Sequence, residues 1–330
     1  MSAAGLKGSA LLPEPWTQDS LSWVSEATLL RGFDERLADV DGIRTRYFIG
    51  GAGPPLVIVH GLGGAAVNFS ELAPLLARRY RVLIPDLAGH GRSRPFVEID
   101  GLTTYANHVA AVAERERMLP ASVLGYSMGG VVALRLAAAR PDDVTALVLA
   151  AAAGIVSTTR RAVVWFRLVT LFKPGQVMTR FREGIARRPR LRWLPFGLWG
   201  AVDPPSLSPR AVIGFLEAAS QHTDTTTAGW ALLEDDPRPD LDRVGCPVLL
   251  LWGARDRLVP LADGFEYARR LRAPIRTLPA AGHLLIGEQP QECAAIVTEF
   301  LDGTREGAAR NRADLVRGGR EALPYARFGV

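Results

Sequence analysis

Residues 121–130 read ASVLGYSMGG, and this stretch decides the predicted fold. The apolar run at 121–124 predicts a buried strand, and residues 128–139 predict a helix that follows it directly. Between them Ser127 stands in a Gly-x-Ser-x-Gly pattern, in which Gly125 and Gly129 leave room for a very tight turn. Such a turn holds the serine in a strained backbone conformation at a helix N-terminus, where N–H groups favour negative charge. The pattern therefore predicts a serine hydroxyl presented for nucleophilic attack.

Two candidate partners follow in the chain order Ser, Asp, His. Asp256 comes just after the apolar run at 248–252, and His283 follows a short strand predicted near 274–279. Functional sites in open α/β sheets gather at the carboxyl ends of strands, so we expect the three residues to meet. A serine hydroxyl needs a base to take its proton, and imidazole titrates near neutral pH. We predict Ser127 as nucleophile, His283 as base and Asp256 as the acid that orients the imidazole.

With these residues the chain resembles the α/β-hydrolase superfamily over about residues 35–302, in its serine-nucleophile, esterase- and lipase-like branch. Two more of its motifs are present, HGLGG at 60–64 and PDLAGHGRS at 85–93, each after an apolar strand. The resemblance implies an oxyanion hole formed by the backbone N–H groups of Leu62 and Met128.

The same resemblance assigns other polar residues of these motifs to the scaffold. It implies that His60 and His90 are structural, although both are catalytic residue types. Asp86 is likewise expected to anchor a turn.

The order of predicted elements agrees with the α/β-hydrolase fold that the resemblance implies. A hairpin at 35–49 with an Asp41-Gly42 turn precedes strands that alternate with helices, which predicts a mostly parallel central sheet with helices on both faces. The strands are expected near 55–60, 81–86, 121–126, 144–151, 246–253 and 274–279, and the helices near 66–79, 102–117, 128–139, 262–272 and 289–301.

A long interval after the strand near 144–151, which is the sixth strand when the two hairpin strands are counted, sets the predicted domain organisation. About 95 residues separate the strand that ends near 150 from the next one, too many for a simple connection. The resemblance places a helical cap there, inserted after the sixth strand. We therefore predict an N-terminal extension (1–34), a core (35–154 and 236–302), a cap (155–235) and a basic C-terminal tail (303–330), the last either a helix or a mobile segment.

Serine at the turn narrows the reaction. Epoxide hydrolases and haloalkane dehalogenases of the superfamily carry aspartate there, which argues against both. The prediction is an enzyme that cleaves a carboxylic ester with an apolar acyl group through an acyl-enzyme. The alternatives are a carbon–carbon bond hydrolase, a cofactor-free perhydrolase on the same residues, or a non-catalytic lipid- or protein-binding module.

The predicted cap is strongly basic. Residues 160–192 carry ten basic side chains and one acidic residue, Glu183, so this segment has a formal charge of +9 against +5 for the whole chain. Three interpretations stay open: a solvated outer face, peripheral contact with an anionic lipid surface, or recognition of an anionic group on the substrate. No nucleic-acid-binding motif accompanies the charge.

The remaining expectations concern the pocket and the surroundings of the chain. An apolar acyl pocket is expected to draw on Trp165, Phe166, Trp199, Trp230 and Leu284, and other cap aromatic residues are weaker candidates. No cofactor and no metal site are predicted. Because no apolar run reaches membrane-spanning length and no signal peptide is evident, we expect a cytoplasmic protein, at most peripherally associated with membrane. The oligomeric state stays open.

Overall fold

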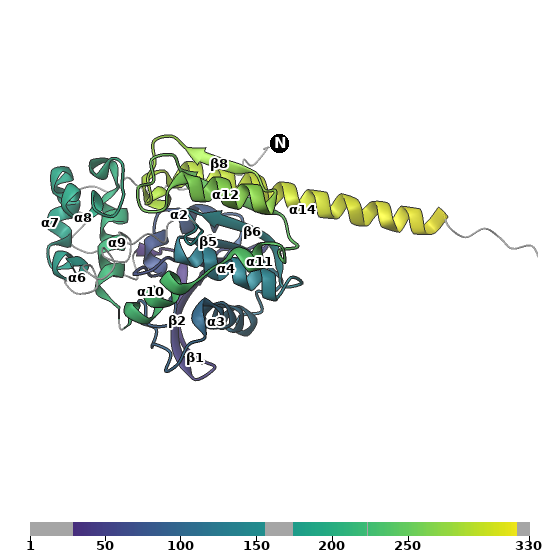
Figure 1. The fold of residues 1–330 in the computed structure, drawn as a ribbon, viewed down its shortest axis with the longest axis horizontal. Coiled ribbons are helices and arrows are strands. Elements are labelled where there is room, and N and C mark those ends of the chain that lie inside the picture. The colour runs from purple at the N-terminus through teal and green to yellow at the C-terminus, as the bar shows by residue number, and fades with distance from the viewer. Residues whose placement is uncertain (1–28, 156–173, 223, 322–330) are drawn as a thin grey trace, which may run out of the picture.

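The computed structural model describes residues 29–155, 174–222 and 224–321. In these residues an eight-stranded sheet has the order β1-β2-β4-β3-β5-β6-β7-β8, and helices cover both of its faces (Figure 1). This confirms the predicted fold class. The strands are β1 (Phe33–Val40), β2 (Ile43–Gly50), β3 (Pro55–Val59), β4 (Arg81–Pro85), β5 (Ala121–Tyr126), β6 (Val144–Ala150), β7 (Val248–Gly253) and β8 (Ile275–Leu278).

The sheet is antiparallel at one edge and parallel in the rest. β1 and β2 form the predicted hairpin, and Asp41 and Gly42 at its tip both have positive φ, 50° and 80°, as a tight Asp-Gly turn requires. β2 pairs antiparallel with β4, and β4-β3-β5-β6-β7-β8 pair in parallel. β5 and β7 are buried along their whole length, which explains their continuous apolar sequences.

Helices flank the sheet in two layers. α3 (Gly101–Arg115) packs on α4 (Met128–Ala139), which lies against β5 and β6, and α12 (Leu261–Leu271) packs on β7 and β8. α13 (Leu285–Glu288) follows β8 and leads into α14, which packs on α2 (Leu72–Leu76). The element order therefore matches the predicted alternation of strands and helices.

The predicted helix at 66–79 is instead two short elements, the 3-10 helix η2 (Ala66–Phe69) and α2. Pro74 lacks the N–H that would bond to Ser70, so one continuous helix cannot form across this point. Ser70 itself lies beneath Gly214, where an added Cβ would come within 2.9 Å of the serine Oγ.

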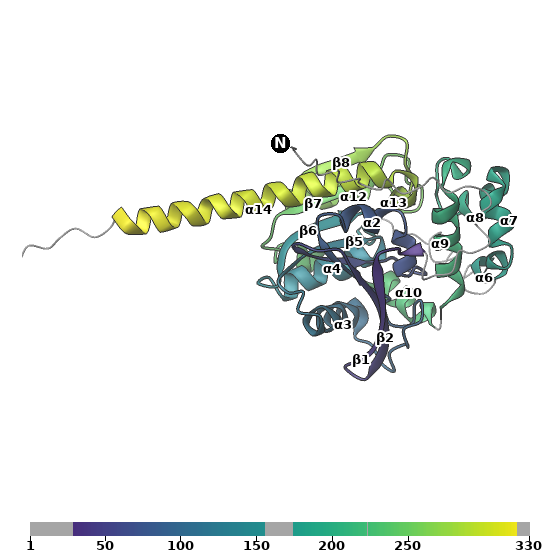
Figure 2. The same ribbon diagram turned by 180° about the vertical axis from the view of Figure 1, so that it is seen from behind.

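α14 (Pro290–Glu321) is much longer than the helix predicted at 289–301. The sequence allows either a basic helix or a mobile tail from residue 303, and in the structure this segment continues the same helix as far as Glu321. Residues 302–321 contain no proline, and their five arginines, three alanines and two glutamates favour helix, whereas their four glycines do not. Figures 1 and 2 show α14 projecting well beyond the sheet.

A group of short helices follows β6. They are α6 (Pro174–Thr179), α7 (Arg182–Arg187), η3 (Pro189–Arg192), α8 (Trp193–Phe196), η4 (Pro204–Ser206), α9 (Pro209–Ser220), α10 (Thr225–Glu234) and α11 (Arg238–Leu241). α9 packs on η2, and α6 and α7 pack on α9.

The end of the predicted cap lies against the core. α10 packs on α3 and α11 packs on α4, so both helices contact core helices, although α10 falls inside the predicted cap at 155–235. The cap boundary itself stays a prediction, and residues 156–173 lie outside the described ranges. Across the described part of the chain, no helix combines the length and apolar composition needed to cross a bilayer.

Candidate active site

Ser127 forms the tip of a sharp turn from β5 into α4. Its backbone has φ 54° and ψ −122°, a conformation that non-glycine residues rarely adopt and that costs about 1–3 kcal/mol. Backbone hydrogen bonds hold it there. The Ser127 N–H donates to the carbonyl of Ala150 (3.0 Å), and the Ser127 carbonyl accepts from Gly130 (2.9 Å) and Ala153 (3.2 Å). The turn is thus fixed by the neighbouring strand and by the first turn of α4.

The glycines on either side of Ser127 are required by close backbone contacts. A Cβ on Gly125 would lie 2.3 Å from the carbonyl oxygen of Gly129. A Cβ on Gly129 would lie 2.4 Å from the carbonyl oxygens of Val59 and His60. Any side chain at these positions would push α4 away from the sheet, so the glycines allow the helix N-terminus to approach the ends of β3 and β5.

The three residues predicted from the sequence lie in one hydrogen-bonded chain. His283 Nε2 is 3.1 Å from Ser127 Oγ, and His283 Nδ1 is 2.8 Å from Asp256 Oδ2. The other carboxylate oxygen, Oδ1, accepts the backbone N–H groups of Leu258 and Val259, both at 2.9 Å. Asp256 and His283 are buried and Ser127 is half-buried. The carboxylate is therefore fixed from both sides, and it faces the imidazole N–H with one oxygen.

Two further groups, which the sequence did not reveal, hold His283 in place. Its backbone N–H donates to the carbonyl of Gly200 (3.0 Å), and its carbonyl accepts the phenolic O–H of Tyr126 (2.9 Å). The Tyr126 ring lies 5.3 Å from the imidazole, centroid to centroid. Burial raises the pKa of Tyr126 well above its usual value, so the phenol stays a donor at neutral pH. The position inside the Gly-x-Ser-x-Gly pattern is the one sequence feature that would have indicated Tyr126.

Glu288 ties the loop of the base to the helices after β6. One carboxylate oxygen accepts the backbone N–H of Val202 (2.6 Å), and the other accepts that of Gly282 (2.9 Å). Burial raises the pKa of this carboxyl. Val202 is 86 residues away from Glu288, so no pattern in the chain points to the bridge between the two segments.

The residues predicted for the oxyanion hole lie beside Ser127. Met128 is the first residue of α4, and Leu62 follows Gly61, where an added Cβ would come within 2.9 Å of the Ser127 Cβ. Within the described ranges, neither the Leu62 nor the Met128 N–H donates to another backbone group. Both donors are thus available to a ligand at the serine, and their role in an oxyanion hole stays a prediction.

His60 and Asp86 are tied into the scaffold around the site. His60 Nδ1 donates to the carbonyl of Gly61 (2.8 Å), and Nε2 accepts the N–H of Leu87 (2.9 Å). The Asp86 carboxylate accepts from the Arg46 side chain and from the backbone of Ala66 (2.8 Å). These contacts fit the expected structural roles.

His60 should make the stability of the fold depend on pH. Burial lowers the pKa of this imidazole to about 3, and burial also lowers the pKa of His90 and His108. Between a pH of about 6.5 and about 3, His60 therefore binds a proton in the unfolded chain but not in the folded chain. We expect the free energy of unfolding to decrease as the pH is lowered from about 6.5 to about 3. His60 alone should contribute up to about 1.4 kcal/mol per pH unit to this decrease.

Urea unfolding at a series of pH values measures this slope. Asp235 acts in the opposite sense, because burial raises the pKa of its carboxyl to about 6 and its folded form favours the proton. The direct check is therefore the imidazole itself, by NMR. A His60 ring that takes up a proton near pH of about 6.5 in the folded protein would contradict the expectation.

The residues expected to line an acyl pocket lie on separate elements of the structure. Leu284 is buried directly after His283, and Trp199 precedes Gly200 and packs edge-on against Phe196 (centroids 5.5 Å apart). Trp230 lies on α10, which packs on α3. Trp165 and Phe166 lie outside the described residues.

Three weaker aromatic candidates do not fit a pocket. Phe181 and Trp193 are more than half exposed, and Phe196 is completely buried against Phe215 and Trp199. The first two face outward because α6 to α8 lie on the far side of α9 from the core.

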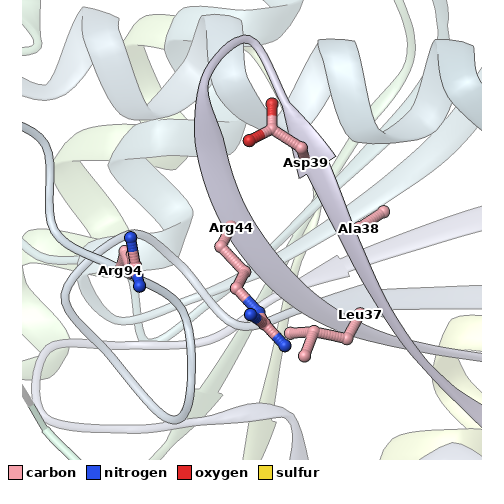
Figure 3. Close-up of a pocket in the computed structure, with 5 residues that line it drawn as sticks. All are labelled: Leu37, Ala38, Asp39, Arg44 and Arg94. Atoms are coloured by element: carbon pink, nitrogen blue, oxygen red, sulfur yellow. The ribbon is translucent and has the colours of Figure 1, made fainter.

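A shallow hollow elsewhere on the molecule lies on the β1–β2 hairpin. It has a volume of about 370 Å³ and is lined by Leu37, Ala38, Asp39, Arg44 and Arg94 (Figure 3). Ser127 is not among these residues, and the arginines are exposed, so the hollow is not part of the candidate site.

Comparisons with known proteins agree with this geometry. The model of the alpha/beta hydrolase family matches residues 56–296. A pimeloyl-[acyl-carrier protein] methyl ester esterase of Chromobacterium violaceum is 31% identical over 256 residues, covering 76% of this chain and 96% of the relative. An uncharacterized protein of Mycobacterium tuberculosis is 28% identical over 302 residues, covering 86% of each chain.

Among solved structures, a bacterial membrane phospholipase A is similar with a TM-score of 0.67 and 27% identity, covering 85% of this chain and 89% of that one. The fold, the serine turn at the carboxyl edge of the sheet and the family match lead to one conclusion: the chain belongs to the alpha/beta hydrolase family.

Proposed function

We propose that the protein is a serine hydrolase that cleaves a carboxylic ester with an apolar acyl group. The observation that carries this proposal is the hydrogen-bonded chain from Ser127 through His283 to Asp256. A nucleophile bonded to a base, which is bonded in turn to an orienting carboxylate, is the arrangement that activates a serine hydroxyl.

The reaction follows from the position of each atom. Ser127 Oγ attacks the ester carbonyl carbon while His283 Nε2 takes its proton, and Asp256 stabilises the imidazolium. The negative charge on the carbonyl oxygen faces the N–H groups of Leu62 and Met128, and each such donor is worth about 3 kcal/mol in the transition state. The imidazolium then protonates the leaving alcohol, which leaves an acyl group on Ser127.

Water completes the cycle by the same route. His283 takes a proton from a water molecule that attacks the acyl carbon. The proton then returns to Ser127 Oγ as the carboxylic acid departs. The free enzyme is regenerated, and only the ester and one water molecule are consumed.

Two of the similar proteins support an ester as the bond that is cleaved. The 31% identical relative is a pimeloyl-[acyl-carrier protein] methyl ester esterase, and the 27% identical solved structure is a membrane phospholipase A. Both are hydrolases of a carboxylic ester, and an aliphatic acyl chain is the group that we propose for the substrate of this protein. Buried Leu284 beside the base and Trp199 next to Gly200 are apolar groups suited to such a chain.

The test is kcat/KM across p-nitrophenyl esters from acetyl to palmitoyl. We expect a maximum at a medium or long acyl chain, because each methylene buried from water contributes about 0.8 kcal/mol. A maximum at acetyl would contradict the apolar acyl group. Turnover of none of the esters would contradict the ester reaction and favour carbon–carbon cleavage or peracid chemistry.

A further inference from the structure

The outer layer of the helices after β6 exposes an unusual number of large apolar side chains. Among the described residues, five of the eight large apolar side chains that stand out as exposed lie between 177 and 198, and they are 52% to 65% exposed. They are Val177, Phe181, Trp193, Leu194 and Leu198. The other three are scattered over distant elements, as is normal for a soluble surface.

These five side chains belong to elements packed in series. α7 packs on η3, and η3 packs on α8, so Phe181 at the start of α7 and Trp193 at the start of α8 lie on connected elements. Val177 lies in α6, which packs on α9 beside α7. Figures 1 and 2 both show α6, α7 and α8 on the side of α9 that faces away from the sheet. We call this layer, residues 174–200, the outer cap surface.

The inner side of the same layer already has its packing partners. Ile185, Ala186 and Phe196 are buried, and the Thr179 hydroxyl donates to the carbonyl of Leu216 on α9 (2.6 Å). The exposed apolar groups are therefore not needed to hold the layer on the core. Exposed Trp, Phe and Leu side chains gathered on one surface are typical of an interaction site.

Arginines accompany these apolar groups in the same segment. The outer cap surface carries six arginines and one acidic residue, Glu183, a formal charge of +5. Two of the arginines are used within the fold: Arg192 is buried and donates to the carbonyl of Pro205 (2.7 Å), and Arg182 pairs with Glu217 (2.6 Å). The other four are exposed and pair with no acidic group among the described residues; they are Arg180, Arg187, Arg188 and Arg190.

We propose that the outer cap surface docks on a lipid bilayer that carries anionic headgroups. Trp, Phe and Leu side chains enter the interfacial region of the bilayer, and the four unpaired arginines meet headgroup phosphates. Charge complementarity selects this occupant, because an apolar partner surface would leave four arginines without counterions. The presence of exposed Trp and Leu argues against a purely ionic partner such as an acidic polypeptide.

The outer cap surface is connected to the loop that carries the base. Only Trp199 separates Leu198 from Gly200, whose carbonyl accepts the backbone N–H of His283. An added Cβ at Gly200 would lie 3.1 Å from the His283 Cβ. Docking is nonetheless a binding property, independent of the proposed reaction, so it is measured on the inactive Ser127→Ala variant as well as on the wild type.

The experiment is sedimentation with phosphatidylcholine vesicles, with and without phosphatidylglycerol, at low and high salt. Each arginine near an anionic surface contributes about 1 kcal/mol, so replacing Arg180, Arg187, Arg188 and Arg190 by glutamine should lower partitioning at least about 100-fold. Trp193→Ala with Leu194→Ala and Leu198→Ala should lower it about tenfold. Added salt should weaken binding of the wild type.

Matched controls make the same kinds of substitution at exposed positions outside the outer cap surface. Replacing the exposed Arg44, Arg78, Arg94 and Arg276 by glutamine removes the same charge, and Phe265→Ala removes an exposed aromatic side chain from α12. Both controls should bind vesicles as the wild type does. Circular dichroism and thermal unfolding establish that every variant is folded.

Several outcomes would overturn the proposal. These are no binding to phosphatidylglycerol vesicles, equal binding to vesicles of phosphatidylcholine alone, or an equal loss in the arginine control. Retention on immobilised polyglutamate without vesicle binding would assign the surface to an acidic polypeptide. A wild-type dimer that the Trp193, Leu194 and Leu198 changes dissociate would assign it to a second copy of the chain.

Discussion

Ser127→Ala should lower kcat/KM for the best p-nitrophenyl ester by about 10⁵- to 10⁶-fold while the fold is kept. The substitution removes the atom that forms the acyl-enzyme, and only transition-state contacts such as the oxyanion donors remain. The backbone at 127 has positive φ, which costs alanine no more than serine, so the turn should persist. Loss of one half-buried hydroxyl should change the free energy of unfolding by no more than about 1 kcal/mol.

Ser122→Ala is the matched control for this variant. Ser122 is a buried serine on the same strand, β5, and its hydroxyl lies 3.1 Å from that of Thr145, at the end of the strand remote from Ser127. This variant should keep wild-type activity. An active Ser127→Ala enzyme, or an equal loss in Ser122→Ala, would contradict the proposed role of Ser127.

Asp256→Asn should lower kcat by about 10⁴-fold with little change in KM. Oδ1 of the carboxylate accepts two backbone N–H groups, those of Leu258 and Val259, so an asparagine oxygen would take that position. Its amide NH₂ would then face His283 Nδ1, which would have to accept a hydrogen bond. The ring proton would move to Nε2, the nitrogen 3.1 Å from Ser127 Oγ, and the base could no longer take the serine proton.

Steady-state measurement of kcat and KM with the preferred ester checks this prediction, and a thermal unfolding curve establishes that the variant is folded. Asp242→Asn, an exposed carboxylate ahead of β7, serves as the control and should be fully active. Activity of Asp256→Asn within about tenfold of the wild type would show that the carboxylate does not set the imidazole tautomer.

Local patterns were sufficient to predict the central part of this molecule. The continuous apolar runs of β5 and β7, the Asp-Gly hairpin and the glycines around Ser127 each have a short-range physical cause, so the strands and the turn were predicted near their observed positions. The chain order of Ser127, Asp256 and His283, combined with the parallel topology, was enough to predict that they meet.

Contacts between distant segments could not be predicted in the same way. Glu288 bridges Val202 and Gly282, and Tyr126 bonds to the carbonyl of His283, yet no periodicity records either contact. The outward direction of Phe181 and Trp193 depends on how α7 and α8 pack on their neighbours. The two differences in helix bounds have partly local causes: Pro74 and packing against α9 divide the helix predicted at 66–79, and α14 continues past 302 in a segment without proline.

The most direct measurement of the central claim is the mass of the protein after reaction with a fluorophosphonate, which traps an activated serine as a stable adduct. The proposed mechanism predicts one phosphonyl group per chain, located on Ser127 by tandem mass spectrometry, and no adduct on Ser127→Ala. Absence of an adduct on the folded wild type, or its location on another residue, would contradict the assignment of Ser127 as an activated nucleophile.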